Sequence, residues 1–179
     1  MKVRMFLLVA SLLATTYLSS QQIAYIYTDS VLLSMPKYAA NMSEFENLKQ
    51  NYQKELEQNK IQLQERFDKL LKPYAKAEKE TLAALKMRMA PIDTLSLTAL
   101  MDENTIIQNK SKSYDNLLKS FYARDIQPML DNVRKTISDY ASKNNLTAVY
   151  SIEQLRTSLV YIDNKRDITK IIINLFRKR

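Results

Sequence analysis

Hydrophobic residues recur every three or four positions through the middle of the chain, beginning near Lys37. This spacing keeps the apolar side chains on one face of an α-helix, while Lys, Glu, Gln and Asn occupy the other faces. Pro91 and Asp93 interrupt the pattern after Met89, and it then resumes. Such residues end helices or start turns. The sequence therefore predicts two long helices joined by a turn over residues 90–96.

The first predicted helix carries an apolar stripe with several aromatic members. They are Tyr38, Phe45, Tyr52, Phe67 and Tyr74. Two antiparallel helices that lie side by side bury such stripes against each other. Packing within the hairpin is therefore the first expectation for these side chains, and contact with a bound partner is the alternative.

Two prolines lie inside the helical pattern. Pro73 and Pro128 each remove a backbone N–H, which predicts a kink at each position. The stripe of the second helix is thin between Asp102 and Ser113, where polar residues dominate. We therefore expect looser packing toward the tip of the hairpin.

The two ends of the chain carry short runs of β-branched and aromatic residues, which are typical of strands. Ile23–Tyr27, Leu146–Ile152 and Ser158–Ile162 are expected to form three strands. Residues 153–156 are expected to be a loop between the last two. The sequence thus predicts a small sheet whose strands come from both ends of the chain.

Short polar residues indicate where the flanking helices begin and end. Thr28 or Asp29 is expected to cap a brief helix that Pro36 ends or redirects. Asn144-Asn145 is expected to end the return helix, because Asn adopts the left-handed conformation better than most residues other than Gly.

A last helix is expected near the carboxyl end. Asp167 or Thr169 is expected to cap it. Its predicted apolar residues are Ile168, Ile171, Ile172 and Leu175.

These elements predict an α+β fold in a single domain over residues 21–179. Residues 21–36 and 144–179 are expected to form a sheet-containing base. Residues 37–143 are expected to form an inserted helical hairpin, or arm. A base this small and a hairpin without a third layer bury little apolar surface, and no disulfide can staple them, so we expect a homo-oligomer.

Residues 1–20 are expected to be a signal peptide that is cleaved near Ser20. Lys2 and Arg4 precede an uncharged apolar run over Met5–Leu18, and Ser19 supplies a further small residue near the cleavage site. The run is shorter than the roughly 20 residues of a membrane span. An uncleaved anchor is the alternative, while a lipoprotein would need a Cys, which the sequence lacks.

Composition excludes most kinds of active site. The chain has no Cys, no His and no Gly. It therefore lacks thiolate nucleophiles, His-based triads and metal centres, and Gly-rich phosphate loops. We expect neither an enzyme nor a cofactor. The net charge of +8 is compatible with anionic lipid or acidic polypeptide as a partner, and nucleic acid fits an exported protein less well.

Several segments together resemble the Skp/OmpH family of periplasmic chaperones. Each motif is short and apolar, and the order and spacing of the motifs carry the resemblance across essentially all of residues 21–179. They are Ile23–Asp29 with Val31–Leu33, Met35–Tyr38, Ile126–Met129, Leu159–Ile162 and Asp167–Thr169.

The resemblance implies a homotrimer whose helical arms, coiled-coil-like tentacles, surround a cavity. Such proteins hold unfolded outer-membrane proteins in the periplasm without ATP and prevent their aggregation. No catalytic residues come with the resemblance. The alternative is a non-enzymatic structural or tethering protein of the cell envelope. The absence of Gly and the nearly balanced charge of the arm depart from the family pattern, so no lipopolysaccharide-binding cluster is carried over.

The resemblance also directs attention to two sets of arm residues. The candidates for client contact are Ile61, Met87, Met89 and Ile106. A basic arm patch, which is either a solvated face or a site for anions such as a membrane surface, consists of Lys69, Lys72, Lys76, Lys79, Lys86 and Arg88.

Overall fold

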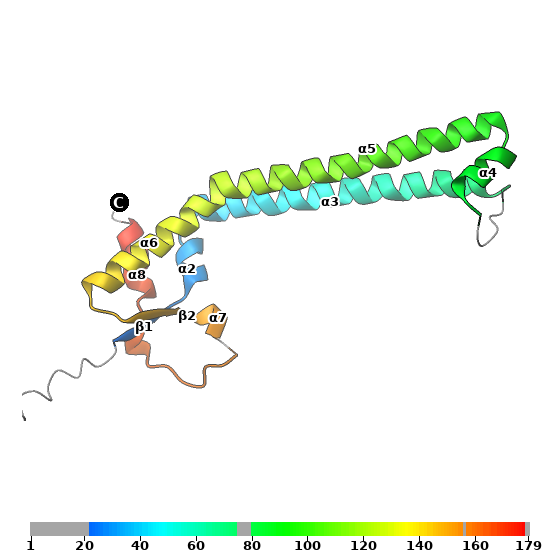
Figure 1. The fold of residues 1–179 in the computed structure, drawn as a ribbon. Helices are drawn as coiled ribbons and strands as arrows, with labels where there is room; N and C mark the ends of the chain where they lie inside the picture. Colours follow the sequence, from blue (N-terminus) through cyan, green and yellow to red (C-terminus); the bar gives the residue numbers. More distant parts are fainter. Residues whose placement is uncertain (1–21, 75–79, 156, 178–179) are drawn as a thin grey trace, which may run out of the picture. The chain divides into compact units, whose positions relative to one another are not determined.

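The computed structural model of the chain describes residues 22–74, 80–155 and 157–177 (Figure 1). The chain divides into two compact units. We call residues 40–128 the hairpin unit, and we call the described residues up to Ala39 and from Met129 the base unit. The expected signal peptide lies outside the described residues.

The base unit contains a small parallel sheet. Its strands are β1 (Ile23–Ile26) and β2 (Ala148–Ser151), which come from opposite ends of the chain as predicted. On the other edge of β1, Tyr25 forms an isolated parallel bridge with Asp167. The sheet therefore depends on three segments that are far apart in the sequence.

The prediction of a third strand at Ser158–Ile162 is wrong. Residues 157–163 form neither strand nor helix, and Val160 and Tyr161 are 102% and 82% exposed. Strand propensity takes effect when a segment finds an edge with which to pair, and the bridge to Asp167 already lies on the free edge of β1. The predicted loop at residues 153–156 is also wrong, because α7 (Ile152–Leu155) is a helical turn.

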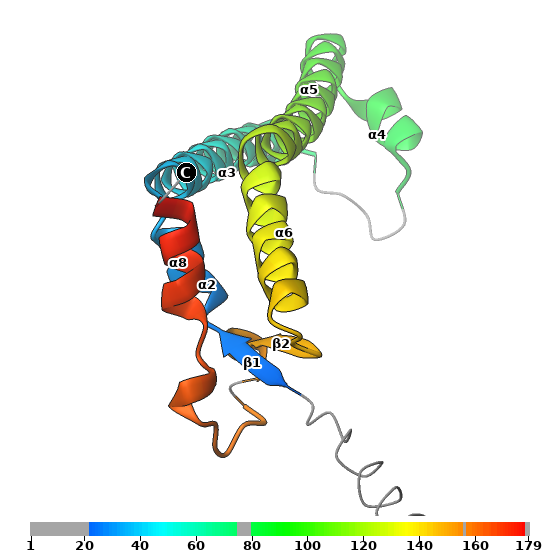
Figure 2. The same cartoon turned by 90° about the vertical axis from the view of Figure 1, so that its left-hand side faces the viewer.

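Three helices lie on one side of the sheet: α2 (Thr28–Leu33), α6 (Gln127–Lys143) and α8 (Thr169–Arg177) (Figure 2). They enclose an apolar core in which Val31 and Ile172 are completely buried. Since α6 supplies Val133 to this core, the base unit includes return-helix residues that we placed in the arm from the sequence.

The inward face of α8 was predicted only in part. Ile168 and Ile172 are buried as expected, but Ile171 and Leu175 are 42% and 38% exposed. Phe176 packs against the core instead. A short helix with two overlapping apolar faces can bury either one, and its sequence alone does not decide which.

The predicted caps have mixed outcomes. Asn145 has φ 53° and ends α6 in the left-handed conformation, as predicted. The Leu146 N–H then donates to the Ala141 carbonyl at 2.9 Å, as in a Schellman motif. The Asp167 carboxylate accepts the Thr169 N–H at 2.8 Å, which confirms its capping role at α8.

The start of α2 is capped by a distant residue. Neither Thr28 nor Asp29 caps it with its own side chain. The Asp29 N–H donates instead to the Glu153 carboxylate at 3.1 Å, across 124 residues of sequence. Burial alone would raise the pKa of Glu153, but hydrogen bonds from Ser151 and from the backbone lower it below its usual value.

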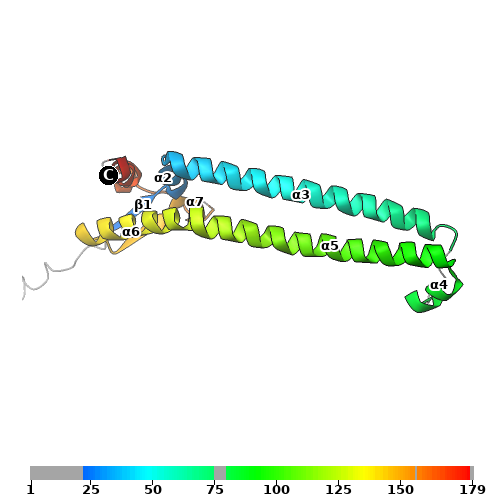
Figure 3. The same cartoon turned by 90° about the horizontal axis from the view of Figure 1, so that it is seen from above.

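The hairpin unit is built from two long antiparallel helices, α3 (Pro36–Leu71, whose first turn lies in the base unit) and α5 (Pro91–Phe121), which lie side by side (Figure 3). Along their seam, Leu63 of α3 meets Leu100 and Ile107 of α5 in a buried cluster. The two predicted apolar stripes therefore face each other.

The tip of the hairpin differs from the prediction. Helix α3 ends at Leu71 rather than kinking at Pro73, since the residue before a proline avoids the helical region. Pro91 does not lie in a turn. It occupies the first position of α5, where its missing N–H costs nothing. Between the two helices lies α4 (Leu82–Arg88).

A buried cluster also contradicts the expected loose packing of the tip. Leu85, Met89 and Leu97 are each less than 8% exposed and pack together. Phe67 and Tyr74 cover this tip cluster from the end of α3 and from the turn that follows it. Helix α4 thus supplies the third layer that a two-helix hairpin lacks.

Pro128 has an effect on the return helix, although not a simple kink. The π-helix η2 (Tyr122–Ile126) joins α5 to α6 immediately before the proline. Its wider turn accommodates the loss of a backbone N–H. The Asn41 side chain donates to the Asp125 carbonyl at 2.9 Å, so one carbonyl of this irregular turn gains a side-chain partner.

Candidate interaction surfaces

The aromatic stripe of α3 is used inside the molecule. The ring centroids of Phe45 and Phe121 are 6.1 Å apart. The rings of Tyr52 and Tyr114 stack, with centroids 3.9 Å apart. Tyr38 packs against the base core. Packing within the hairpin, the first expectation for the stripe, therefore holds for Phe45, Tyr52, Phe67 and Tyr74, whereas Tyr38 packs in the base unit instead.

A polar group interrupts the apolar seam midway along the hairpin. The Lys110 ammonium and the Tyr114 hydroxyl both donate to the Glu55 carboxylate. The bond from Lys110, followed by that from Tyr114, lowers the pKa of Glu55, and the same contacts raise the pKa of Lys110 and of Tyr114. These bonds join α3 to α5 at this level, and the lowered pKa favours the ionised form of the Glu55 carboxylate.

The candidates for client contact divide into exposed and buried residues. Ile61, Met87 and Ile106 are 50%, 88% and 64% exposed. Met89 is 7% exposed because its side chain belongs to the tip cluster, so we withdraw it as a contact residue. Its spacing continues the helical stripe, and no local pattern indicated that α4 would carry it into a cluster against the end of α3.

The basic arm patch is partly engaged by the protein itself. Arg88 binds Glu80 at 2.6 Å, and this bond raises the already high pKa of the guanidinium. The Lys86 ammonium donates to the Thr98 hydroxyl at 3.2 Å. Lys69 and Lys72 are exposed. The remaining members, Lys76 and Lys79, lie outside the described residues.

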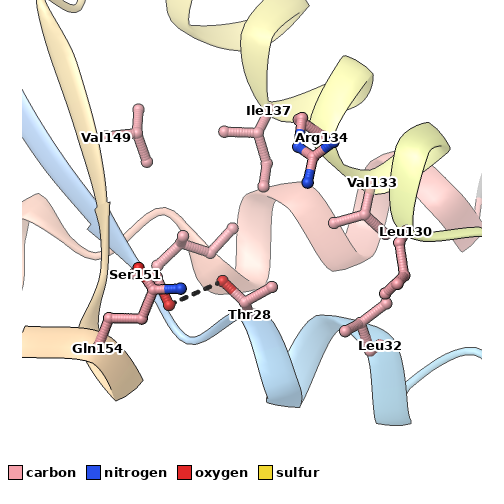
Figure 4. A pocket seen from close by; sticks show the side chains of 10 residues that line it. Thr28, Leu32, Leu130, Val133, Arg134, Ile137, Val149, Ser151 and Gln154 are labelled. Carbon is pink, nitrogen blue, oxygen red and sulfur yellow. Dashed lines mark hydrogen bonds between the residues drawn. The ribbon is translucent and has the colours of Figure 1, made fainter. Parts of the chain in front are cut away.

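The base unit has a cavity of about 360 Å³ that the sequence analysis missed (Figure 4). Apolar side chains such as Ile26, Leu32 and Val133 line it, together with Arg134. At one side Thr28 donates to Ser151 at 3.2 Å. The lining comes from three separate stretches of the sequence, so no local sequence pattern could have indicated the cavity.

Exposed apolar side chains also occur on the base unit. Leu33 is 66% exposed, and it joins Ile171 and Leu175 as large apolar residues that the core does not cover. Val160 and Tyr161 extend this exposed set. Among the described residues no helix is both long and apolar enough to cross a membrane, and no cluster of three potential metal ligands occurs.

The comparisons with known proteins agree with this architecture. The family model described as outer membrane protein (OmpH-like) matches residues 22–176. No curated protein matches the sequence. The family match covers both strands, the whole hairpin unit and nearly all of α8. On this basis the chain belongs to the OmpH-like family.

Proposed function

We propose that this chain is an ATP-independent holdase that binds unfolded outer-membrane proteins in the periplasm and prevents their aggregation. Its family is known for periplasmic chaperones of outer-membrane proteins, which are not enzymes. The signal-like pattern of residues 1–20 supports export.

One observation carries the proposal beyond family membership. The hairpin unit has already buried its main apolar stripes in the seam and the tip cluster, and it still exposes Met87, Ile92, Leu95 and Ile106 by 64% or more each. Single exposed apolar side chains are common on folded proteins, but several on one hairpin support the proposal that it carries an interaction surface. An unfolded protein offers the apolar segments that such a surface binds.

In this proposal the holdase is a homotrimer that assembles through the base unit. Three features support self-association there: the cavity lined in part by Val133, the unpaired segment with Val160 and Tyr161, and exposed Leu33. A second copy would cover apolar surface that the base unit leaves open. Val160→Asp tests this interface, because a fully exposed side chain can be replaced without disturbing the core. It should convert the trimer to smaller species.

The decisive experiment is a mass measurement of the protein without residues 1–20, alone and with a urea-unfolded outer-membrane β-barrel protein diluted into it without nucleotide. We expect a trimer that acquires one barrel chain and keeps it soluble. A monomer, or a trimer that ignores the unfolded chain while binding a folded envelope protein, would contradict the proposal. The latter result would favour the structural or tethering alternative.

A further inference from the structure

Helix α5 carries a second set of apolar side chains outside the seam. Ile92 and Leu95 are each 68% exposed, Ile106 is 64% exposed and Leu117 is 51% exposed. We call these four residues the α5 flank. Helix α5 exposes one further large apolar side chain, that of Met101, which is 37% exposed.

The members of the α5 flank lie on one side of the helix, with wide gaps between them. Leu95, Ile106 and Leu117 are separated by steps of eleven residues, and eleven residues make three turns of helix to within about 20°. Each step advances about 16 Å along the axis. At about 100° per residue, the flank lies roughly a quarter turn from the buried residues Leu100 and Ile107, on the side opposite to Met101.

One exposed charged residue, Asp102, lies on the flank side of α5 between Leu95 and Ile106. Ala99, Ser113 and Ser120 lie on the same side of α5. The charged neighbours Glu103 and Lys110 are engaged in ion pairs with α3, in which Arg66 and Glu55 are their partners. Away from Asp102, an apolar segment that lies on this side therefore displaces water from apolar and weakly polar groups, which lowers the cost of binding.

Building on the proposed function, we infer that the α5 flank is the surface of the hairpin unit on which the unfolded client chain lies. The outer face of α3 has no equivalent. Ile61 is the large apolar residue that α3 exposes, and charged residues such as Lys54, Glu57 and Lys60 occupy the rest of that face. The two helices of one hairpin thus have different roles.

The spacing and area of the flank favour an unfolded chain over a folded partner. A helix from a second copy packs through apolar residues every three or four positions, whereas the flank has gaps of eleven. Burying one Leu or Ile removes roughly 60–120 Å² of apolar surface. Four partly exposed ones therefore offer far less than the about 800 Å² per partner of a stable interface. An extended chain crosses each gap with about five residues.

Charge further specifies the client. At the tip end of the flank, the Lys86 ammonium donates to Thr98, which lies about one helical turn from Leu95 on α5. Asp102 lies nearer the middle of the flank. A segment that combines apolar residues with an acidic residue therefore fits best when its carboxylate lies toward the tip. The occupant that we assign is an unfolded chain of this composition.

The test uses the full mature protein and an unfolded outer-membrane β-barrel protein. Because the chain contains no Trp, the Trp emission of the client reports binding without background. The variant L95Q/I106Q/L117Q retains helix-forming residues, since Gln and Leu have similar helix propensity. We expect its affinity for the client to fall roughly tenfold or more, with unchanged oligomer mass and helix content. The matched control M101Q, an exposed apolar residue on the other side of α5, should change affinity less than twofold.

The outcomes separate this inference from the proposed function. If the wild type does not retain the client, the proposed function fails. If the wild type and the triple variant retain the client equally, the assignment of the flank is overturned while the holdase proposal stands. The same holds if M101Q weakens binding as much as L95Q/I106Q/L117Q does. A second readout uses the absence of Cys in the chain. A benzophenone attached at Ile106→Cys should cross-link the client, and one attached at Lys54→Cys on α3 should not. Equal cross-linking at both positions would contradict the inference.

Discussion

Helices α3 and α5 share one seam but differ in what they present to solvent. Helix α3 has twelve charged residues among 36, whereas α5 has seven among 31. The larger difference is in exposed apolar side chains. Helix α3 exposes one large apolar residue, Ile61, whereas α5 exposes five. Selection for stability of a hairpin would not distinguish its two helices in this way. The contrast indicates that α3 keeps the unit soluble and that α5 carries the interaction surface.

The largest effect should come from residues that are buried in the seam and in the tip cluster. We expect Leu63→Ala on α3 and Leu97→Ala on α5 each to lower the free energy of unfolding by about 2–5 kcal/mol, since both side chains are 5% exposed or less. Urea unfolding followed by circular dichroism at 222 nm measures the loss.

Each of these variants has a control two residues away on the same helix. Ile61 and Leu95 point outward, at 50% and 68% exposure, so Ile61→Ala and Leu95→Ala should change stability by about 0.5 kcal/mol or less. A large loss for Leu95→Ala would mean that the α5 flank supports the fold, and the functional contrast between the helices would then collapse.

A smaller effect should appear in the pH dependence of the seam. The pKa of Glu55 is lowered from 4.5 by its bonds to Lys110 and Tyr114. These bonds therefore stabilise the fold above pH 4.5, and the contribution is lost as pH falls through the lowered pKa. The difference in urea midpoint between the wild type and Glu55→Gln should be largest near neutral pH and shrink toward pH 3. A constant difference would show that the carboxylate charge has no role.

The smallest effect is expected from the ion pair that joins the exposed sides of the two helices. Arg66 and Glu103 approach to 2.7 Å, with side chains 53% and 38% exposed. A double-mutant cycle with Arg66→Ala and Glu103→Ala should give a coupling energy below about 1 kcal/mol that declines with added salt. A larger, salt-independent coupling would mean that charge also fixes the register of α3 against α5.

Local patterns predicted the parts of the fold that depend on neighbours in sequence. The period of the apolar stripes predicted the seam, and Asn145 was identified as the end of α6 because its residue type suits a left-handed backbone. The α+β class followed from strands at both chain ends, as observed.

The features that were missed depend on distant partners. The third strand was expected from composition, but it lacks an edge on which to pair within one chain. Glu153 caps α2 from 124 residues away, and Met89 is buried because α4 folds over the end of α3. The α5 flank was glimpsed only at Ile106. Ile92 and Leu95 were missed because they fell within the predicted turn over residues 90–96.

The pairing of β1 with β2 also has a consequence for how the chain acquires its structure. Gln22 and Thr147, which are hydrogen-bonded beside the two strands, are 125 residues apart in sequence. The first strand therefore stays unpaired until residues 148–151 are available, and closing so long a loop is slow. Contacts between α3 and α5 shorten that loop once they form. The hairpin is then a folding template for the base, and a chain interrupted before Ala148 would emerge as a hairpin without a sheet.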